Sequence, residues 1–209
     1  MTRKELLDSI NLIEELIAKD RHNRPGDKIK VTKLTIHNTD NTDKGANAKA
    51  HSSFVRFTGY YTLPNGKTQW VSWHYTVDDS RAIRQLPDNE RAYHAGSSAN
   101  STSLAMEICM NSDNNQPACD DRSARLAALI LHDQGLPISA MVTHESWTGK
   151  ECPALLRAPA KWAAFQKLVK GYLDGIQTAK DAKLLTKANA AKFGFKACQC
   201  AKDSDHEVA

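Results

Sequence analysis

The alternation of apolar and polar residues predicts four strands. Residues 31–37 and 104–110 alternate in the way that strands do when they bury one face. Residues 70–77 and 82–85 are also strand-like and flank a polar turn, so we expect them to pair. Helical spacing or alanine-rich composition predicts helices over residues 3–19, 45–58 and 120–134, and a last core-facing helix through Trp162, Phe165, Val169 and Tyr172. Strands interleaved with helices are typical of an α/β domain.

Glycine, proline and small polar residues mark the breaks between these elements. Leu63-Pro-Asn-Gly66 predicts a turn, and the small polar residues 95–103 predict a surface loop. Gly135 lies where the helix over residues 120–134 is expected to stop. Pro153 is suited to the first position of a helix, which would place Cys152 at a helix N-terminus. The backbone dipole there would favour a thiolate.

The two ends of the chain differ in pattern from its middle. Residues 3–19 are amphipathic, and we expect this helix to pack on the domain rather than to bind a partner. We therefore divide the chain into an N-terminal helix at 1–20, a domain at 21–175 and a polar extension at 176–209. The extension is too short to form an independently stable module without a metal or a disulfide.

Composition indicates a soluble globular protein and narrows the classes of partner. The 209 residues carry 28 basic and 24 acidic side chains, a net charge of +4, which is compatible with an anionic polymer but does not require one. The sequence has no Lys/Arg-rich run with interleaved aromatic residues, so nucleic-acid binding is not favoured. No segment approaches the ~20 consecutive apolar residues of a membrane span. The first residues lack the apolar core of a secretory signal, so we expect synthesis in a reducing cytoplasm. The oligomeric state stays open.

The side-chain types that bind zinc lie at three places in the chain. His144 precedes Cys152 by eight positions, and His37 ends the strand over residues 31–37. Zinc favours imidazole and thiolate ligands, and three protein ligands leave a fourth position for water, as in catalytic sites. Taken singly, each residue is better explained as a surface histidine or a free cysteine, and it is the joint arrangement that favours zinc. A second cluster, Cys198, Cys200 and His206, is a weaker candidate for a metal clip, and the redox state of its cysteines stays open.

Several motifs in one order give the chain a family resemblance. They are Asn23-Arg-Pro-Gly26, Leu34-Thr-Ile-His-Asn-Thr-Asp-Asn41, Ser72-Trp-His-Tyr-Thr-Val-Asp-Asp79 with Gln85-Leu-Pro, Tyr93-His-Ala-Gly96, Met106-Glu-Ile-Cys109, and His144 through Pro153. Over about residues 21–172 the chain resembles the zinc-dependent N-acetylmuramoyl-L-alanine amidases, the group that includes peptidoglycan recognition proteins and phage lysins. The likeness is closest to lysins of Bacillus phages and prophages. It implies a central mixed sheet flanked by helices, with Zn²⁺ in a groove at one edge, held by His37, His144 and Cys152.

Glu107 is the second chemical feature of the chain. It lies among apolar strand residues, where a carboxylate is costly unless it is paired or functional, and a salt-bridged structural role is the alternative. The resemblance implies that Glu107 is catalytic and that Lys150, two residues before Cys152, is catalytic too. It also implies the bond that is cut, between the lactyl group of N-acetylmuramic acid and L-alanine of the stem peptide.

The spacing and periodicity of the sequence say less about which residues contact the substrate. We assign substrate binding to His94, Trp73 and His74, although for His74 a supporting or core role is favoured over metal ligation. Some members of the family carry a tyrosine where this chain has Trp73, and that tyrosine's role is not transferred. His51 and His132 fall in predicted helices, and we interpret both as structural.

Two other classes of function compete with a peptidoglycan amidase. A non-catalytic peptidoglycan-binding protein of the same fold commonly lacks the cysteine ligand, which is present here as Cys152. A structural zinc module would call for a fourth nearby protein ligand, and the sequence offers none. For the setting, a phage lysin that reaches the wall through a membrane lesion is favoured over a toxin delivered by a secretion machine. A cytoplasmic recycling enzyme is the third hypothesis.

Overall fold

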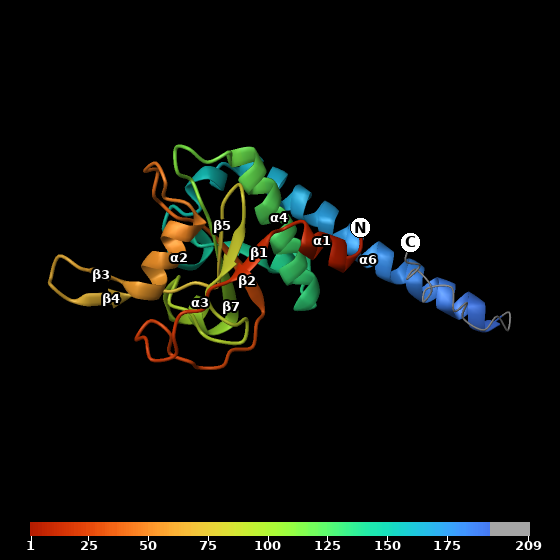
Figure 1. Cartoon of the computed structure of the whole chain (residues 1–209), viewed down its shortest axis with the longest axis horizontal. Helices are drawn as coiled ribbons and strands as arrows, with labels where there is room; N and C mark the ends of the chain where they lie inside the picture. Colours follow the sequence, from red (N-terminus) through yellow and green to blue (C-terminus); the bar gives the residue numbers. More distant parts are fainter. Residues whose placement is uncertain (193–209) are drawn as a thin grey trace, which may run out of the picture.

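A six-stranded sheet organises the chain, and the computed structural model describes residues 1–192, with side chains to residue 180 (Figure 1). The strand order is β1-β6-β5-β7-β2-β8, and every neighbouring pair is parallel except β5 and β6. The strands are β1 (Leu12–Glu14), β2 (Lys33–Asn38), β5 (Tyr75–Val77), β6 (Ala82–Arg84), β7 (Ser103–Ile108) and β8 (Met141–Thr143). The predicted mixed sheet is therefore confirmed.

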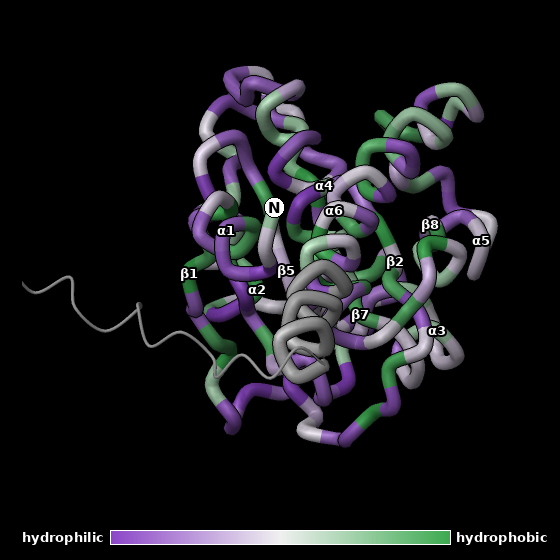
Figure 2. Tube along the Cα trace, turned by 90° about the vertical axis from the view of Figure 1, so that its right-hand side faces the viewer, coloured by the Kyte–Doolittle hydropathy of each residue, from purple (hydrophilic) through white to green (hydrophobic). Residues whose placement is uncertain are grey.

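Helices cover both faces of this sheet. The α-helices are α1 (Arg3–Asp8), α2 (Ala48–Phe57), α3 (Gly96–Thr102), α4 (Gln116–Asp133), α5 (Glu145–Thr148) and α6 (Pro159–Lys192). Two short 3-10 helices, η1 (Ile138–Ala140) and η2 (Ala154–Leu156), join the last elements. The main core packs α1, α4 and α6 against one face of the sheet, and a smaller cluster packs α2 against the other. Figure 2 shows hydrophobic stretches through the central strands and mostly hydrophilic loops around them.

The alternation along β7 decides which side chain faces which layer. Met106 packs in the main core under α4, and Ala105 packs in the smaller cluster beneath α2. Successive side chains of a strand point to opposite faces, so Glu107 shares the α2 side with Ala105. This places the Glu107 carboxylate near the end of the strand, on the side where a cavity opens.

The predicted helix over residues 3–19 is wrong beyond Asp8. Asn11 adopts the left-handed conformation, with φ of 56°, and the chain then pairs in parallel with β6 as strand β1. The apolar residues at helical spacing are buried by different partners, since Ile10 packs in the main core and Ile17 in the smaller cluster. Ile13, on the same supposed helix face, is 36% exposed. The helical spacing of these apolar residues therefore arose because two different cores bury them, and not because they share one face of a helix.

The segment 95–103 is also not the loop that its composition predicts. It forms α3, with Ala99 and Asn100 buried. The Asn100 carboxamide oxygen accepts hydrogen bonds from the backbone N–H groups of His94 and Ala95, at 2.9 and 3.0 Å. These tertiary contacts stabilise a helix of small polar residues that local propensity alone does not favour.

The remaining local predictions are refined by the structure. Leu63–Gly66 forms the expected turn, with Gly66 at φ of 76°, and it joins the hairpin of β3 (Tyr60–Thr62) and β4 (Thr68–Trp70). The strand expected over residues 70–77 is therefore divided between β4 and β5. The helix expected at 120–134 begins earlier, at Gln116, because the Asn115 side chain caps it.

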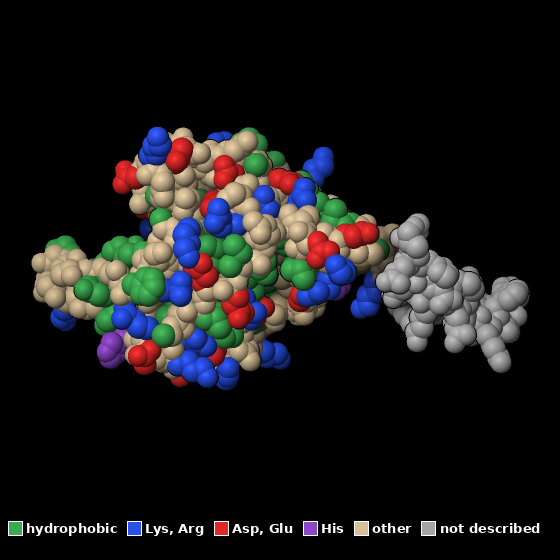
Figure 3. Space-filling view, viewed as in Figure 1, with side chains coloured by type: hydrophobic (Ala, Val, Ile, Leu, Met, Phe, Trp, Pro, Cys, Tyr) green, Lys and Arg blue, Asp and Glu red, His purple; other side chains and the backbone are tan. Residues whose placement is uncertain are grey.

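The C-terminal part of the described chain is helical. α6 runs from Pro159 to Lys192 without a break at residue 176, and Figure 1 shows it extending from the body of the molecule. The proposed divisions at residues 20 and 175 stay predictions, and Cys198, Cys200 and His206 lie outside the described residues. Among the described helices, none combines the length and the apolar character that a bilayer crossing needs. Acidic and basic side chains are interspersed over the face drawn in Figure 3, in keeping with a modest net charge.

Candidate metal and catalytic centre

Neighbouring parallel strands bring the predicted metal ligands together at one edge of the sheet. His37, near the end of β2, is the register partner of Glu107 on β7. On its other side β2 pairs with β8, and His144 follows the last residue of β8. The carboxyl ends of adjacent parallel strands meet at one edge, which is where open α/β sheets bind their ligands. The loop after α5 brings Cys152 to the same place.

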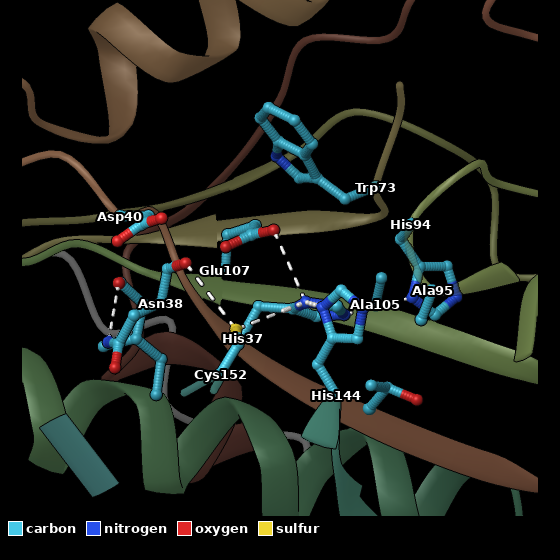
Figure 4. A network of polar contacts seen from close by, with 12 residues as sticks. His37, Asn38, Asp40, Trp73, His94, Ala95, Ala105, Glu107, His144 and Cys152 are labelled. Atoms are coloured by element: carbon cyan, nitrogen blue, oxygen red, sulfur yellow. Dashed lines mark hydrogen bonds and ion pairs between the residues drawn. The ribbon is translucent and has the colours of Figure 1, made fainter. Parts of the chain in front are cut away.

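The three predicted ligands have the spacing of a tetrahedral metal site (Figure 4). The Nδ1 atoms of His37 and His144 are 3.0 Å apart, and Cys152 Sγ lies 3.8 Å from His37 Nδ1. All three ligand atoms lie within 4.8 Å of one another, and all three residues are buried. Zinc bonds of about 2.0–2.1 Å to nitrogen and about 2.3 Å to sulfur put tetrahedral ligand atoms roughly 3.3–3.6 Å apart. The residues therefore fit a Zn²⁺ ion with little movement.

Burial sets the protonation of these ligands. It lowers the pKa of His37 well below its ordinary value, helped by the nearby His94 and His144, and it also lowers the pKa of His144. Both imidazoles are thus neutral, which is the form that binds metals. Burial, with Glu107 next in effect, raises the pKa of the Cys152 thiol to about 12. A bound cation reverses this and deprotonates a coordinating thiol.

The helix dipole contributes less to Cys152 than the sequence suggested. The turn after Pro153 is η2, a 3-10 helix of three residues, and not the α-helix that Pro153 was expected to open. So short an element has little dipole to offer a thiolate. A thiolate at Cys152 would therefore depend on a bound metal ion rather than on the following helix.

The Glu107 carboxylate faces the ligands from β7. Its Oε1 is 3.8 Å from His37 Nδ1, and its buried Oε2 has no hydrogen-bond partner within the part of the chain that the structure describes. Burial raises the pKa of Glu107 to about 8, and the positive charge of Lys150 opposes this rise. A buried, unpaired oxygen beside a metal site is what a proton acceptor for a bound water requires. Among the described ion pairs, Glu107 has no Lys or Arg partner, so the alternative of a salt-bridged structural glutamate is not supported.

Lys150 reaches the same site from the loop before Cys152. Its side chain is 55% exposed, and its Nζ lies 3.9 Å from an Asp40 carboxylate oxygen. Among the described residues, this loose contact is the only ion pair of the ammonium group, which can therefore also contact a negative charge in the cavity. A cation beside a developing oxyanion stabilises it.

A cavity of about 800 Å³ opens over these groups. Its wall contains all three predicted ligands, both predicted catalytic residues and two of the three predicted substrate residues. A second hollow of about 490 Å³ shares Val71, Tyr93, His94 and His144 with the first. The two hollows therefore adjoin at these four residues, two of which, His94 and His144, belong to the candidate centre.

The three predicted substrate residues have different surroundings. Trp73 lines the cavity, but it is only 7% exposed and its indole N–H donates to Thr76 Oγ1 at 2.6 Å. His74 is fully buried and lines neither hollow; Ala105 N–H donates to its Nδ1 at 3.0 Å, and its Nε2 bonds to the Glu90 carbonyl at 2.8 Å. Both ring nitrogens of His74 are therefore occupied by backbone groups, and the substrate contact expected of it is wrong.

His94 lines both hollows and also touches a metal ligand. Its Nδ1 lies 3.0 Å from His37 Nε2. Burial lowers the pKa of His94 to about 3, with smaller contributions from His74 and His144, so its ring is neutral. The sequence placed His94 beside the groove, but it gave no sign of the contact with His37.

The sequence reasoning missed His51. It lies on α2, lines the larger hollow, and its buried Nε2 has no partner among the described residues, so it is not the purely structural residue we expected. The signal was present, because Ala50, His51 and Phe54 fall on one stripe of the predicted helix at helical spacing. His132 fits its structural assignment, with Nδ1 3.0 Å from Asp133.

Comparisons with known proteins agree with this fold. Residues 27–155 match the family model described as N-acetylmuramoyl-L-alanine amidase. CwlH of Bacillus subtilis (strain 168) is 36% identical over 151 residues, covering 70% of this chain and 57% of the relative; XlyA of the same strain is 32% identical over 193 residues, covering 91% and 61%. Both carry the name N-acetylmuramoyl-L-alanine amidase. The solved catalytic domain of XlyA superposes with a TM-score of 0.68 at 32% identity, over 77% of this chain and 99% of that domain.

Proposed function

Because the chain belongs to the N-acetylmuramoyl-L-alanine amidase family, we propose that it hydrolyses the amide bond between N-acetylmuramic acid and L-alanine in peptidoglycan. The chain spans about three fifths of the length of the curated relatives described above, at 57% and 61%. The observation that carries the proposal is the convergence of His37, His144 and Cys152 beneath the unpaired oxygen of Glu107. An unpaired carboxylate beside these three residues favours hydrolysis over binding alone.

His37 Nδ1, His144 Nδ1 and Cys152 Sγ would hold the zinc ion. When bound, Zn²⁺ polarises the scissile carbonyl and lowers the pKa of a water toward ~7. The Glu107 carboxylate takes the proton of the attacking water and later gives it to the nitrogen of the leaving L-alanine. The Lys150 ammonium stabilises the negative charge that develops on the carbonyl oxygen. Trp73 and Phe54, stacked with ring centroids 6.4 Å apart, form an apolar part of the cavity wall beside the carboxylate.

The deciding experiment compares intact wall with a soluble fragment. The purified protein should release stem peptides with a free L-alanine amino group from sacculi, detected by mass spectrometry, and a chelator should stop the release. Cleavage of a soluble anhydro-muropeptide alone would establish the recycling role instead. Binding without cleavage would establish the non-catalytic alternative.

Replacing Lys150 with methionine should lower the rate of amide hydrolysis by about 10²-fold, because the oxyanion loses the positive charge of the Lys150 ammonium group. Zinc content should not change, since Lys150 is not among the candidate ligands. Initial rates on a soluble muramoyl peptide give the measurement, and Lys161→Met on the exposed side of α6 is the matched control. A rate equal to that of the control would remove Lys150 from the mechanism.

A further inference from the structure

A chain of hydrogen-bonded polar side chains runs from the candidate metal site along β2 and β7, on the sheet face that carries Glu107. His37 Nε2 lies 3.0 Å from His94 Nδ1, and His94 Nε2 lies 3.2 Å from Ser103 Oγ. Ser103 Oγ lies 2.9 Å from Thr35 Oγ1, and the Trp147 indole N–H donates to Thr35 Oγ1 at 2.9 Å. Thr35 and Ser103 are fully buried.

The donors at the far end of this chain set the direction of its hydrogen bonds. An indole N–H can only donate, so Trp147 uses a lone pair of Thr35 Oγ1. The Thr35 hydroxyl then has one acceptor among its contacts in the described structure, which is Ser103 Oγ. The Ser103 hydroxyl in turn donates to the Ala99 carbonyl, 3.0 Å away. Ser103 Oγ is thereby left as an acceptor for His94.

The direction at Ser103 determines the proton positions on both imidazoles. With Ser103 as acceptor, neutral His94 carries its proton on Nε2, and its bare Nδ1 accepts from His37 Nε2–H. His37 then presents an unprotonated Nδ1 to Cys152 and His144, which is the form that a metal needs. The opposite direction, with Ser103 donating to His94, would put the His37 proton on Nδ1 and block that lone pair.

We propose that Ser103 and His94 are positioning residues that hold His37 in its metal-binding tautomer. Trp147 and Thr35 fix the donor and acceptor roles in the series of hydrogen bonds that leads through Ser103 to His94. His94 acts through His37, so its contribution to zinc affinity is separate from any contact with substrate. This inference rests on the zinc site of the proposed function, but the tautomer can be measured in zinc-free protein without any substrate.

The wild-type protein provides the first test. In zinc-free protein labelled with ¹⁵N-histidine, the ring nitrogen shifts should show His37 protonated on Nε2 and bare on Nδ1. His37 protonated on Nδ1 would overturn the proposal, whatever the activity of the enzyme. Because no substitution is made, no loss of fold can obscure this result.

The second test uses substitutions that alter one link each. Ser103→Ala frees His94 to reverse, so His37 should shift toward the Nδ1–H form and zinc affinity should fall by about 10–100-fold, measured by competition with a chromophoric chelator. His94→Ala should lose a similar amount. His94→Asn should recover most of that loss, because its carboxamide oxygen can accept from His37 Nε2–H.

A matched control separates the effect of the Ser103–His94–His37 hydrogen bonds from the general effect of removing a buried hydroxyl group. Ser123, on α4, is also fully buried, and Ser123→Ala should leave both the His37 tautomer and zinc affinity as in the wild type. If a folded Ser103→Ala protein kept the wild-type zinc affinity and the wild-type His37 tautomer, the positioning role of Ser103 would be refuted. Equal losses in His94→Asn and His94→Ala would refute the acceptor role of His94.

Discussion

The Glu107→Gln variant is expected to lose roughly 10²–10⁴-fold in amide hydrolysis while keeping its fold and its zinc. Glutamine has nearly the shape of glutamate, so the packing of β7 is preserved, but its carboxamide cannot take a proton from water. The structural reason to place the proton acceptor here is a carboxylate whose Oε1 lies 3.8 Å from His37 Nδ1 and whose buried Oε2 has no partner among the described residues. Steady-state rates on a soluble muramoyl peptide, with zinc analysis of the same sample, give the measurement.

The control for this variant is Glu14→Gln on the edge strand β1. Its side chain is 58% exposed and pairs loosely with Arg84, so activity should stay at the wild-type level. If Glu107→Gln turned over at a rate near the wild type, Glu107 would return to a structural role. The proton transfer would then have to be assigned to another group in the cavity.

The Cys152→Ala variant is expected to lose its zinc and, with it, all measurable activity. Only two of the three candidate ligands remain in this variant, and alanine offers no donor atom in place of the buried sulfur. Elemental analysis after gel filtration should give about one zinc per chain for the wild type and much less for the variant. Circular dichroism on both proteins checks that the fold is retained.

A second cysteine tests whether this loss is specific. Cys109 is a fully buried free thiol that lies in the main core and does not line the cavity. Cys109→Ala should therefore keep its zinc, even if removal of the buried sulfur lowers thermal stability. Full zinc occupancy in Cys152→Ala would contradict the ligand assignment, and zinc loss in both variants would point to a general effect of destabilisation.

Local patterns in the sequence were sufficient for several central elements. Alternation located β2 and β7 and put Glu107 on the face opposite Met106. Turn chemistry located the turn at Gly66, and the residue types favoured by zinc singled out His37 with Cys152. These features follow from the chain's own periodicity and from side-chain chemistry, which need no knowledge of what packs against them.

Local patterns were insufficient where a residue's environment comes from a distant segment. Ile10 and Ile17 have helical spacing, but two different cores bury them, and β6 takes the intervening residues as a strand. The local sequence does not distinguish the environment of His74 from that of His94. Tertiary packing alone bonds one to backbone groups in the core and the other to a metal ligand.

The sequence by itself determined which side chains are able to do the chemistry, because donor atoms and strand periodicity are local properties. Only the tertiary structure decided their geometry. The parallel register that sets His37 opposite Glu107, and the pairing of β8 that brings His144 alongside, join residues 70 and 107 positions apart. Such a register is fixed by the burial of both sheet faces under α2, α4 and α6, a condition that no single stretch of the chain contains.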